Sequence, residues 1–263
     1  MNSLKSKILA CTVTSLLCLY LNMPGAWAET QTLTKDSKLH PQGWSVGDEI
    51  EFKKNTAVSL NDNGEVIAGT LANNTLLCPR GRERVINDYY FISAYTERGP
   101  FFSIRYRHFW GREYNIAIPG YGHLLYKKGT RVTFSEQGEV LKGMIASKAT
   151  VRLRDDKYGF IVFKENSVLE FYPSGNILSG VLAADTYLRP VGWASLPASD
   201  DMTNNSVGFI RFSKDKQVMF NEQGELVSGT LKESAILWAG DGNAVEYPAN
   251  TNVRFNNQGH VEQ

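Results

Sequence analysis

The sequence predicts an all-β fold, in which antiparallel β-hairpins form an open or curled meander sheet. Three observations predict this class. One motif recurs along the chain with fixed spacing. Each copy holds two short runs in which apolar and polar residues alternate, and a polar turn ending in glycine separates the two runs. Repeats of this length are typical of stacked or radial arrays.

The repeat is clearest between Phe163 and Trp193. With the leading aromatic as position 0, every copy has an apolar residue at position 8 and a glycine at position 12. Four copies also have a glycine at position 17 and an aliphatic residue at position 19. The copies start at Phe52, Tyr126, Phe163, Phe212 and Tyr247. Their turn glycines are Gly64, Gly138, Gly175, Gly224 and Gly259, and the position 17 glycines are Gly69, Gly143, Gly180 and Gly229.

Each copy predicts a hairpin. Apolar residues at positions 6 and 8 indicate a half-buried strand, and the glycine at position 12 allows the positive φ that a tight reversal needs. The second run carries the glycine of position 17, which suggests a bulge or a close approach of neighbouring backbone. A second turn is expected at Asn74-Thr75, Asp185-Thr186 and Ser234, where such side chains bond their own backbone. One hairpin buries too little apolar surface to fold alone, so neighbouring units must stack.

The spacing of the copies leaves two questions open. The starts at 126 and 163 are 37 residues apart, whereas 52 and 126 are 74 apart, which predicts a degenerate or replaced unit between them. Residues 32–44 align with 181–193 as the back half of a unit, and the last copy stops after a front half. Because two such halves could close a ring, a β-propeller-like ring is the alternative to an open array.

Residues 1–28 predict a secretory signal peptide. Lys5 and Lys7 precede an apolar run from Ile8 to Leu21, and Ala26-Trp27-Ala28 resembles a cleavage site. The repeat domain would then span 29–263, exported to the periplasm or the extracellular space, without a transmembrane anchor. Cleavage leaves 26 basic against 27 acidic residues, so no nucleic-acid partner is expected. It also leaves Cys78 as the sole cysteine, so no internal disulfide can form, and we interpret that thiol as a small buried hydrophobe.

Segment 79–122 departs most from the repeat and is the candidate ligand-binding region. It holds seven arginines, eleven aromatic residues and no lysine. Arginine beside aromatic side chains favours recognition of carboxylates, phosphates or sugar rings. The alternative is a degenerate unit whose aromatics form core and whose arginines are solvated. The candidate binding residues are Arg105, Tyr106, Arg107, His108 and Trp110.

Other motifs have a structural interpretation instead. Residues 43–47 match the G-x-S-x-G of hydrolases but lack the strand and helix that this motif needs. Asn61 to Glu65 fails the full calcium-loop pattern, and Glu136 and Glu222, a conceivable acid and base pair, are turn residues. The loop 194–205, which contains Asp200-Asp201, is interpreted as a surface insertion. The four histidines lack zinc-binding spacing. The sequence therefore predicts no catalytic residue, metal site or cofactor.

The core F-x-x-x-G-x-V-x-x-G-x-L, as in FSEQGEVLKGMI and FNEQGELVSGTL, resembles the hairpins of MORN-type repeat proteins and of exported bacterial repeat proteins. The resemblance covers roughly Gly122 to Gln263 and Phe52 to Leu77. The unit here is longer, and the tyrosine-glycine and tryptophan spacing of MORN repeats is missing. The resemblance implies an elongated antiparallel sheet and a scaffold or interaction role, and it supplies no site residues.

Two functional hypotheses and a third role follow. The first is a non-enzymatic binding or scaffold module at the cell envelope or outside the cell, with an envelope protein or a glycan as its partner. The alternative is a secreted hydrolase acting on glycan or peptide, which would need two carboxylates converging in one cleft. The third is a purely structural role, which would follow if segment 79–122 packs completely into the fold.

Overall fold

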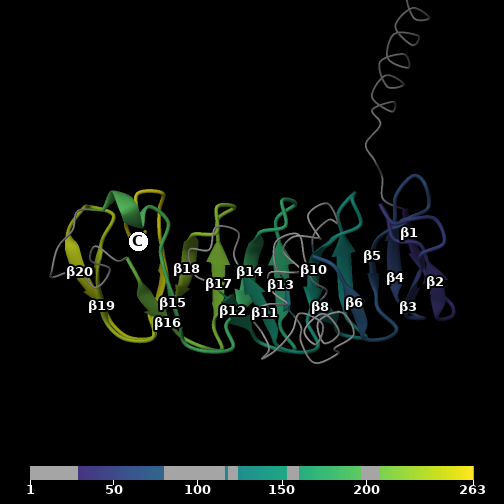
Figure 1. Ribbon diagram of the computed structural model, residues 1–263, viewed down its shortest axis with the longest axis horizontal. Helices are drawn as coiled ribbons and strands as arrows, with labels where there is room; N and C mark the ends of the chain where they lie inside the picture. The colour runs from purple at the N-terminus through teal and green to yellow at the C-terminus, as the bar shows by residue number, and fades with distance from the viewer. Residues whose placement is uncertain (1–28, 80–115, 118–123, 153–159, 197–207, 263) are drawn as a thin grey trace, which may run out of the picture.

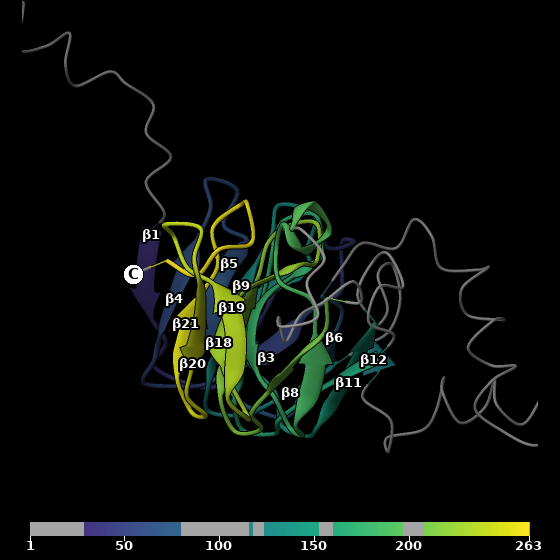
Figure 2. The same ribbon diagram turned by 90° about the vertical axis from the view of Figure 1, so that its left-hand side faces the viewer.

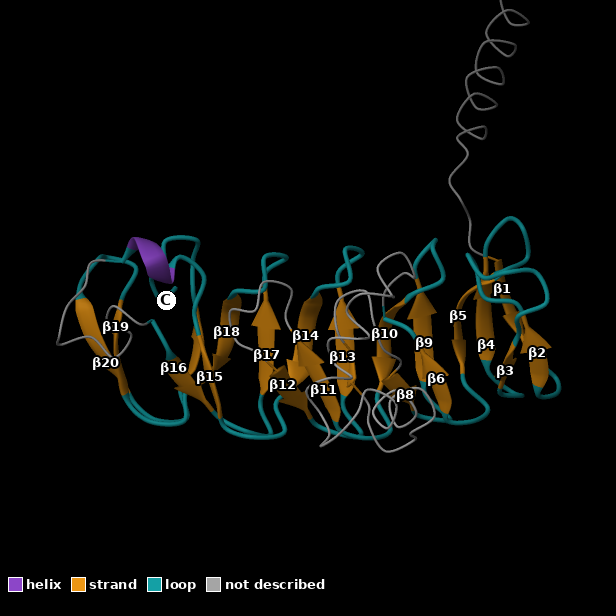
Figure 3. Ribbon diagram, in the orientation of Figure 1, coloured by secondary structure: helices purple, strands orange, loops and turns teal. Residues whose placement is uncertain are grey.

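The computed structural model describes residues 29–79, 116–117, 124–152, 160–196 and 208–262. These residues form strands, turns and one short 3₁₀ helix, η2 (Trp193–Ser195), and contain no α-helix (Figure 3). The predicted all-β class is confirmed. The predicted signal peptide, most of segment 79–122 and most of loop 194–205 lie outside the described residues.

Ten strands form one long antiparallel sheet, which runs along the molecule in Figure 1. Each of the four complete units supplies a hairpin of two neighbouring strands, and the last copy supplies β21, so the chain meanders along the sheet. The strands stand in the order β1 (Glu29–Thr32), β4 (Ala57–Leu60), β5 (Val66–Thr70), β9 (Arg131–Phe134), β10 (Val140–Met144), β13 (Val168–Phe171), β14 (Ile177–Val181), β17 (Gln217–Phe220), β18 (Leu226–Thr230) and β21 (Asn252–Arg254).

A row of shorter strand pairs forms a second layer, which Figure 2 shows beside the sheet. Each pair joins the last strand of one unit to the first strand of the next. The pairs are β2 (Ser37–Leu39) with β3 (Ile50–Phe52), β6 (Thr75–Leu77) with β8 (Leu124–Tyr126), β11 (Ala149–Arg152) with β12 (Phe160–Phe163), β15 (Thr186–Leu188) with β16 (Ile210–Phe212), and β19 (Ala235–Trp238) with β20 (Ala244–Tyr247). A short strand, β7 (Ile116–Ala117), runs parallel to β11.

The array is open. In the sheet order, β1 lies at one end and β21 at the other, and they do not pair with each other. The alternative of a closed ring is therefore wrong, although the two ends do carry complementary halves of a unit. The edge strand β1 is exposed along its whole length and consists of polar residues, as expected for the end of a sheet in contact with water.

The core lies between the two layers and repeats with the sequence. Phe134, Phe171 and Phe220 each end the first strand of a hairpin, and each is at most 5% exposed. Each also faces the first buried residue of the second strand, as in the pair Phe134 and Val140. Equivalent positions therefore have equivalent surroundings, and the predicted stacking of the units is confirmed.

The glycines of position 17 make room for the leading aromatic of their own unit. A Cβ on Gly180 would lie 2.5 Å from Phe163 Cδ1, and the glycines of the other three complete units face Phe52, Tyr126 and Phe212 in the same way. The register shift of each hairpin falls earlier, between Val140 and Lys142 in β10. The predicted bulge is present in the hairpin. The glycine itself, however, makes room for an aromatic ring rather than for neighbouring backbone.

Two backbone positions in each unit have positive φ. The turn glycines of position 12 have φ between 76° and 84°, as the hairpin prediction requires. Position 3 also lies in the left-handed region, at Asn55, Gly129, Asn166, Asp215 and Asn250. There the backbone N–H donates to a carbonyl of the preceding unit, for example from Asn166 to Ile145 over 2.8 Å. Asn, Asp and Gly tolerate this conformation better than other residues, so position 3 is a second conformational requirement of the repeat.

The turn at position 22 links units instead of only closing on itself. Thr75 and Thr186 do bond locally, each donating to the carbonyl two residues earlier. The neighbouring Asn74 and Asp185 side chains accept the backbone N–H of Lys128 and Lys214 in the next unit, over 2.8 and 2.9 Å. The prediction that these side chains bond their own backbone is therefore wrong for Asn74 and Asp185, because the next unit offers an unpaired N–H at that point.

The units that start at Phe52 and Tyr126 are direct neighbours. Strand β5 of the first pairs with β9 of the second, with Gly69 opposite Val132. The degenerate unit predicted between them is therefore not present in the sheet. The chain departs after β6 and returns at β8, and these two strands pair with each other. Segment 79–122 thus lies in the chain between the two strands of a second-layer pair.

Candidate functional site

The predicted binding residues Arg105, Tyr106, Arg107, His108 and Trp110 lie outside the described residues. What the structure defines is the base from which their segment departs. The Cys78 carbonyl accepts the backbone N–H of Val140 over 2.9 Å, which fixes the departing chain to β10. Near the other end of the segment, Ile116 and Ala117 pair with Thr150 and Val151 of β11. The described residues at both ends of the segment therefore contact strands of the unit that starts at Tyr126, β10 at one end and β11 at the other.

Tyr126 carries a buried polar group at this base. Its ring is fully buried, and its hydroxyl has no hydrogen-bond partner among the described residues. Burial, followed by the nearby Cys78, raises the pKa of the Tyr126 hydroxyl well above its ordinary value. Cys78 is half-buried and is not in a disulfide, so the sequence interpretation of a small buried hydrophobe holds only in part.

Tyr126→Phe is expected to raise the free energy of unfolding by about 1–2 kcal/mol, because a buried hydroxyl without a partner costs about that much. Three other units carry Phe at position 0, so the ring itself fits there. Tyr172→Phe is the matched control, since the Tyr172 hydroxyl donates to the Phe220 carbonyl over 3.0 Å and its removal should be destabilising. Urea denaturation of the two variants checks the signs. A destabilised Tyr126→Phe would show that this hydroxyl has a partner after all.

The G-x-S-x-G match, residues 43–47, begins within a structural strap, which we define as residues 40–44. The backbone N–H of Val66 donates to the His40 carbonyl, and the Gln42 side chain donates to the Phe134 carbonyl over 2.9 Å. Trp44 Nε1 donates to the Gly138 carbonyl over 2.8 Å. The strap thus ties the first hairpin to the second. Ser45 is exposed and is flanked by turns rather than by the strand and the helix that a nucleophile elbow needs.

The two conceivable catalytic carboxylates are far apart. Glu136 lies in the turn of the β9–β10 hairpin and Glu222 in the turn of the β17–β18 hairpin, with the β13–β14 hairpin between them. Four strand spacings of about 4.8 Å separate equivalent points of these hairpins, roughly 19 Å in all. A glycosidase pair needs about 5–9.5 Å, so these two residues do not form one.

The Asn61 turn is a hairpin turn rather than a calcium loop. The Asn61 side-chain oxygen accepts the backbone N–H groups of Asn63 and Glu65 over 3.0 and 2.9 Å, and its amide donates to the Glu65 carboxylate. These bonds use the side-chain oxygens within the turn. No group of three or more His, Cys, Asp or Glu side chains that could hold a metal ion occurs in the part of the chain that the structure describes. Asp200-Asp201 lies outside that part.

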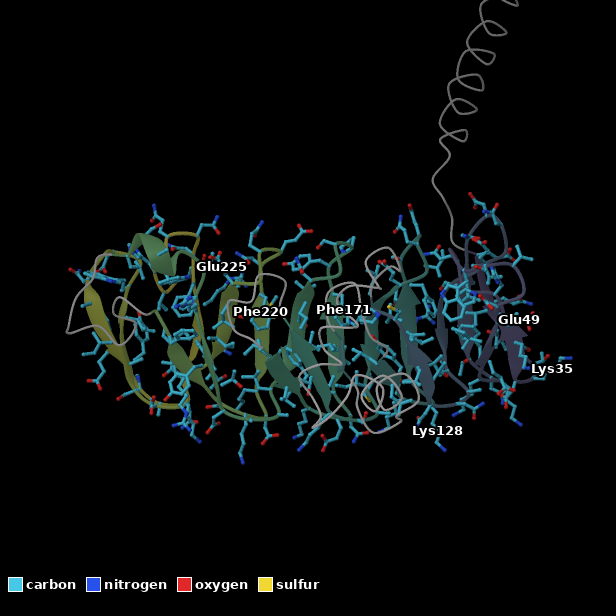
Figure 4. The ribbon with its side chains drawn as sticks, viewed as in Figure 1. Lys35, Glu49, Lys128, Phe171, Phe220 and Glu225 are labelled. Carbon is cyan, nitrogen blue, oxygen red and sulfur yellow. The ribbon has the colours of Figure 1, made fainter. Side chains whose placement is uncertain are left out.

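Charge is segregated between the two long edges of the array, a feature that the sequence reasoning missed. Turns at positions 9–13 form the hairpin edge; these five turns contain six carboxylates and no lysine or arginine. Turns at positions 1–4 form the opposite edge, which we call the lysine edge; they contain seven lysines and two carboxylates. Figure 4 shows Glu225 at the hairpin edge and Lys128 at the lysine edge, with Phe171 and Phe220 between them. An almost neutral chain therefore has two edges of opposite charge.

Near the C-terminal end of the array, several charges on or beside the lysine edge form ion pairs. Lys164 and Asp215 form an ion pair over 2.5 Å, and Asp185 lies 3.2 Å from Lys232 and 3.6 Å from Arg211. The Lys214 backbone N–H, followed by the Lys232 and Arg211 charges, lowers the pKa of Asp185. These groups compensate one another, so this part of the edge is a structural network.

No protein-family model, curated protein or solved structure matches this chain. Within the described residues, no helix has the length and apolar character needed to cross a membrane.

Proposed function

We propose that the chain is an exported, non-enzymatic repeat protein that acts as a binding or scaffold module at the cell envelope or outside the cell. The observation that supports this proposal most is the direct pairing of β5 with β9. The ten-stranded sheet continues from the first unit to the second without any residue of segment 79–122. A long addition that the sheet does not need is a natural place for recognition.

The composition of segment 79–122 indicates what it recognises. Arg105 and Arg107 alternate with Tyr106 and His108, which on an extended chain would present guanidinium groups on one side and rings on the other. Guanidinium forks bind carboxylates in bidentate fashion, and aromatic faces stack on flat apolar or cationic groups. An envelope protein or a glycan with acidic groups would satisfy both.

Residues 1–28 support export to the periplasm or the extracellular space, since they have the charge, apolar run and small residues of a signal peptide. The open two-layer array supports a scaffold role. Such arrays offer long surfaces, and each unit contacts only its neighbours. The resemblance to MORN-type repeats remains a prediction.

Charge reversal tests the proposal. Arg105→Glu with Arg107→Glu should reduce retention by an envelope fraction at least about tenfold, the loss of one or two charge-assisted bonds, without lowering the melting temperature. Lys214→Glu with Lys216→Glu is the matched control, because it makes the same change of net charge on exposed ladder residues. Unaltered retention of the arginine variant would contradict the proposal.

Excision of residues 80–122, with a short Gly-Ser bridge from Pro79 to His123, separates a binding role from a structural one. The ladder should still unfold cooperatively, because β6 and β8 already pair and β5 already pairs with β9. Circular dichroism with thermal melting provides the measurement. Loss of cooperative unfolding would instead assign the segment the purely structural role.

A further inference from the structure

The lysine edge carries an excess of positive charge over its N-terminal part. The turns at positions 1–4, together with the equivalent links at positions 20–22, place six lysines and one carboxylate, Asp36, over the first two units. The next two units place four lysines and four carboxylates on the same edge. We call the first group the lysine patch: Lys35, Lys53, Lys54, Lys127, Lys128 and Lys148.

The lysines of position 1 lie in a line along this edge. Each reaches position 3 of the following unit: Lys127 Nζ donates to Asn166 Oδ1 over 2.6 Å, and Lys164 Nζ binds Asp215 Oδ1. Lys53 Nζ likewise lies 3.8 Å from the point where a side chain on Gly129 would begin. Because each unit adds two strands to the sheet, successive ammonium groups recur about every 10 Å.

The lysines of the patch form no ion pair within the part of the chain that the structure describes. Lys127 is held by a neutral amide, and the carboxylate of Asp36 accepts the backbone N–H of Lys54 over 2.7 Å. The Glu51 carboxylate near this edge accepts the Asn73 amide instead of a lysine. The edge therefore presents a row of ammonium groups that form no ion pair with a described residue, unlike Lys164 and Lys232 in its C-terminal part.

From this row we infer that the lysine patch binds a linear acidic polysaccharide, a polymer that carries carboxylates or sulfates at intervals along one strand. A line of positive charges at regular spacing complements such a polymer, and Asn74, exposed on the same edge, offers its amide N–H groups to the hydroxyls of the polymer. None of the six lysines belongs to segment 79–122, so the inference does not depend on the proposed function.

Two other anionic partners fit the patch less well. Peripheral membrane binding combines basic residues with inserted apolar side chains. The exposed large apolar side chains among the described residues are Val46, Leu76, Val168, Tyr187 and Val245, none of which lies in the turns that carry the patch. Single-stranded nucleic acids stack their bases on aromatic rings, and the leading aromatics beside the patch, Phe52 and Tyr126, are fully buried.

Binding of purified protein to polygalacturonate, with neutral dextran, phosphatidylglycerol vesicles and duplex DNA as comparison ligands, tests the inference. The protein should bind polygalacturonate at low salt and release it at high salt. Lys53→Gln with Lys127→Gln should weaken that binding at least about tenfold, since two charge-assisted contacts are lost. Lys214→Gln with Lys216→Gln, which removes the same charge from the same edge, should change it less than about threefold.

Four results would overturn the inference. They are equal weakening by both pairs of substitutions, binding of vesicles or DNA at least as tight as that of polygalacturonate, no binding of polygalacturonate at low salt, and salt-sensitive self-association that blocks the patch. Thermal melting of each variant guards against misfolding. All four lysines are on the surface or half-buried, and unchanged melting temperatures are expected.

Discussion

Gly180→Ala is expected to lower the free energy of unfolding by about 2–3 kcal/mol, the cost of overpacking a closed core. The new methyl group would lie 2.5 Å from Phe163 Cδ1 and 2.7 Å from Leu169 Cδ1. Both neighbours are fully buried, so neither can move aside without disturbing the next unit. Urea denaturation at equilibrium provides the measurement.

Gly240→Ala is the matched control for Gly180→Ala. Gly240 is exposed, and its nearest neighbour to a new Cβ would be the Val261 carbonyl oxygen at 3.6 Å, an ordinary contact. The control should be close to neutral. Phe163→Leu should recover part of the loss in Gly180→Ala, because a smaller side chain leaves room for the methyl group. Strict additivity of the two substitutions would contradict the pairing of ring and glycine.

Gly138→Ala is expected to cost about 3 kcal/mol, from two sources of about 1–2 kcal/mol each. Gly138 has φ of 84°, and a Cβ there would overlap the Trp44 ring of the strap. Gly64→Ala separates the two sources, because Gly64 has φ of 76° but nothing within 4 Å of a new Cβ. Gly64→Ala should therefore cost only the conformational part. Equal losses in the two variants would show that the strap leaves room for a Cβ at position 138 of the second hairpin.

Much of the hairpin array could be predicted from the sequence, because the conformational requirements of each hairpin are local. Positive φ at Gly138, alternation of buried and exposed residues in β9, and the polar turn between β9 and β10 all follow from residues close together in the chain. The position 3 requirement at Asn55 and Asn166 was equally visible as a run of Asn, Asp and Gly, but the hairpin interpretation did not use it.

Features set by contacts between units could not be predicted. The spacing of 74 residues between Phe52 and Tyr126 fits either a lost unit or an excursion, and only the pairing of Gly69 with Val132 distinguishes them. The two complementary ends likewise fit a ring or an open array, because ring closure depends on accumulated twist rather than on any single unit. Charge segregation was missed because it joins residues from separate units.

The two candidate binding regions also differ in how far the sequence alone could predict them. Arg105 and Arg107 stand out by composition, and the structure adds only the base of their segment at Cys78 and Tyr126. The lysine patch has no such local signal, since Lys53 and Lys127 resemble ordinary surface residues until the sheet places them one unit apart. A site whose residues are close together in the sequence can be predicted from composition. A site whose residues come from separate repeats can be recognised only when the strand register is known.

An engineered disulfide between Ala68 and Thr133 tests most directly whether the units at 52 and 126 are neighbours. These residues are directly opposite in β5 and β9, and opposed residues of antiparallel strands have Cα atoms about 4.5–5.5 Å apart, which a disulfide can span. With Cys78→Ala in the background, Ala68→Cys with Thr133→Cys should oxidise fully, whereas Ala68→Cys with Glu170→Cys, three strands away, should stay reduced. Mass spectrometry without reduction reads the result. If the Cys pair at 68 and 133 remains reduced under oxidising conditions, the direct pairing of β5 with β9 is contradicted. The prediction of a further unit between those that start at 52 and 126 would then hold.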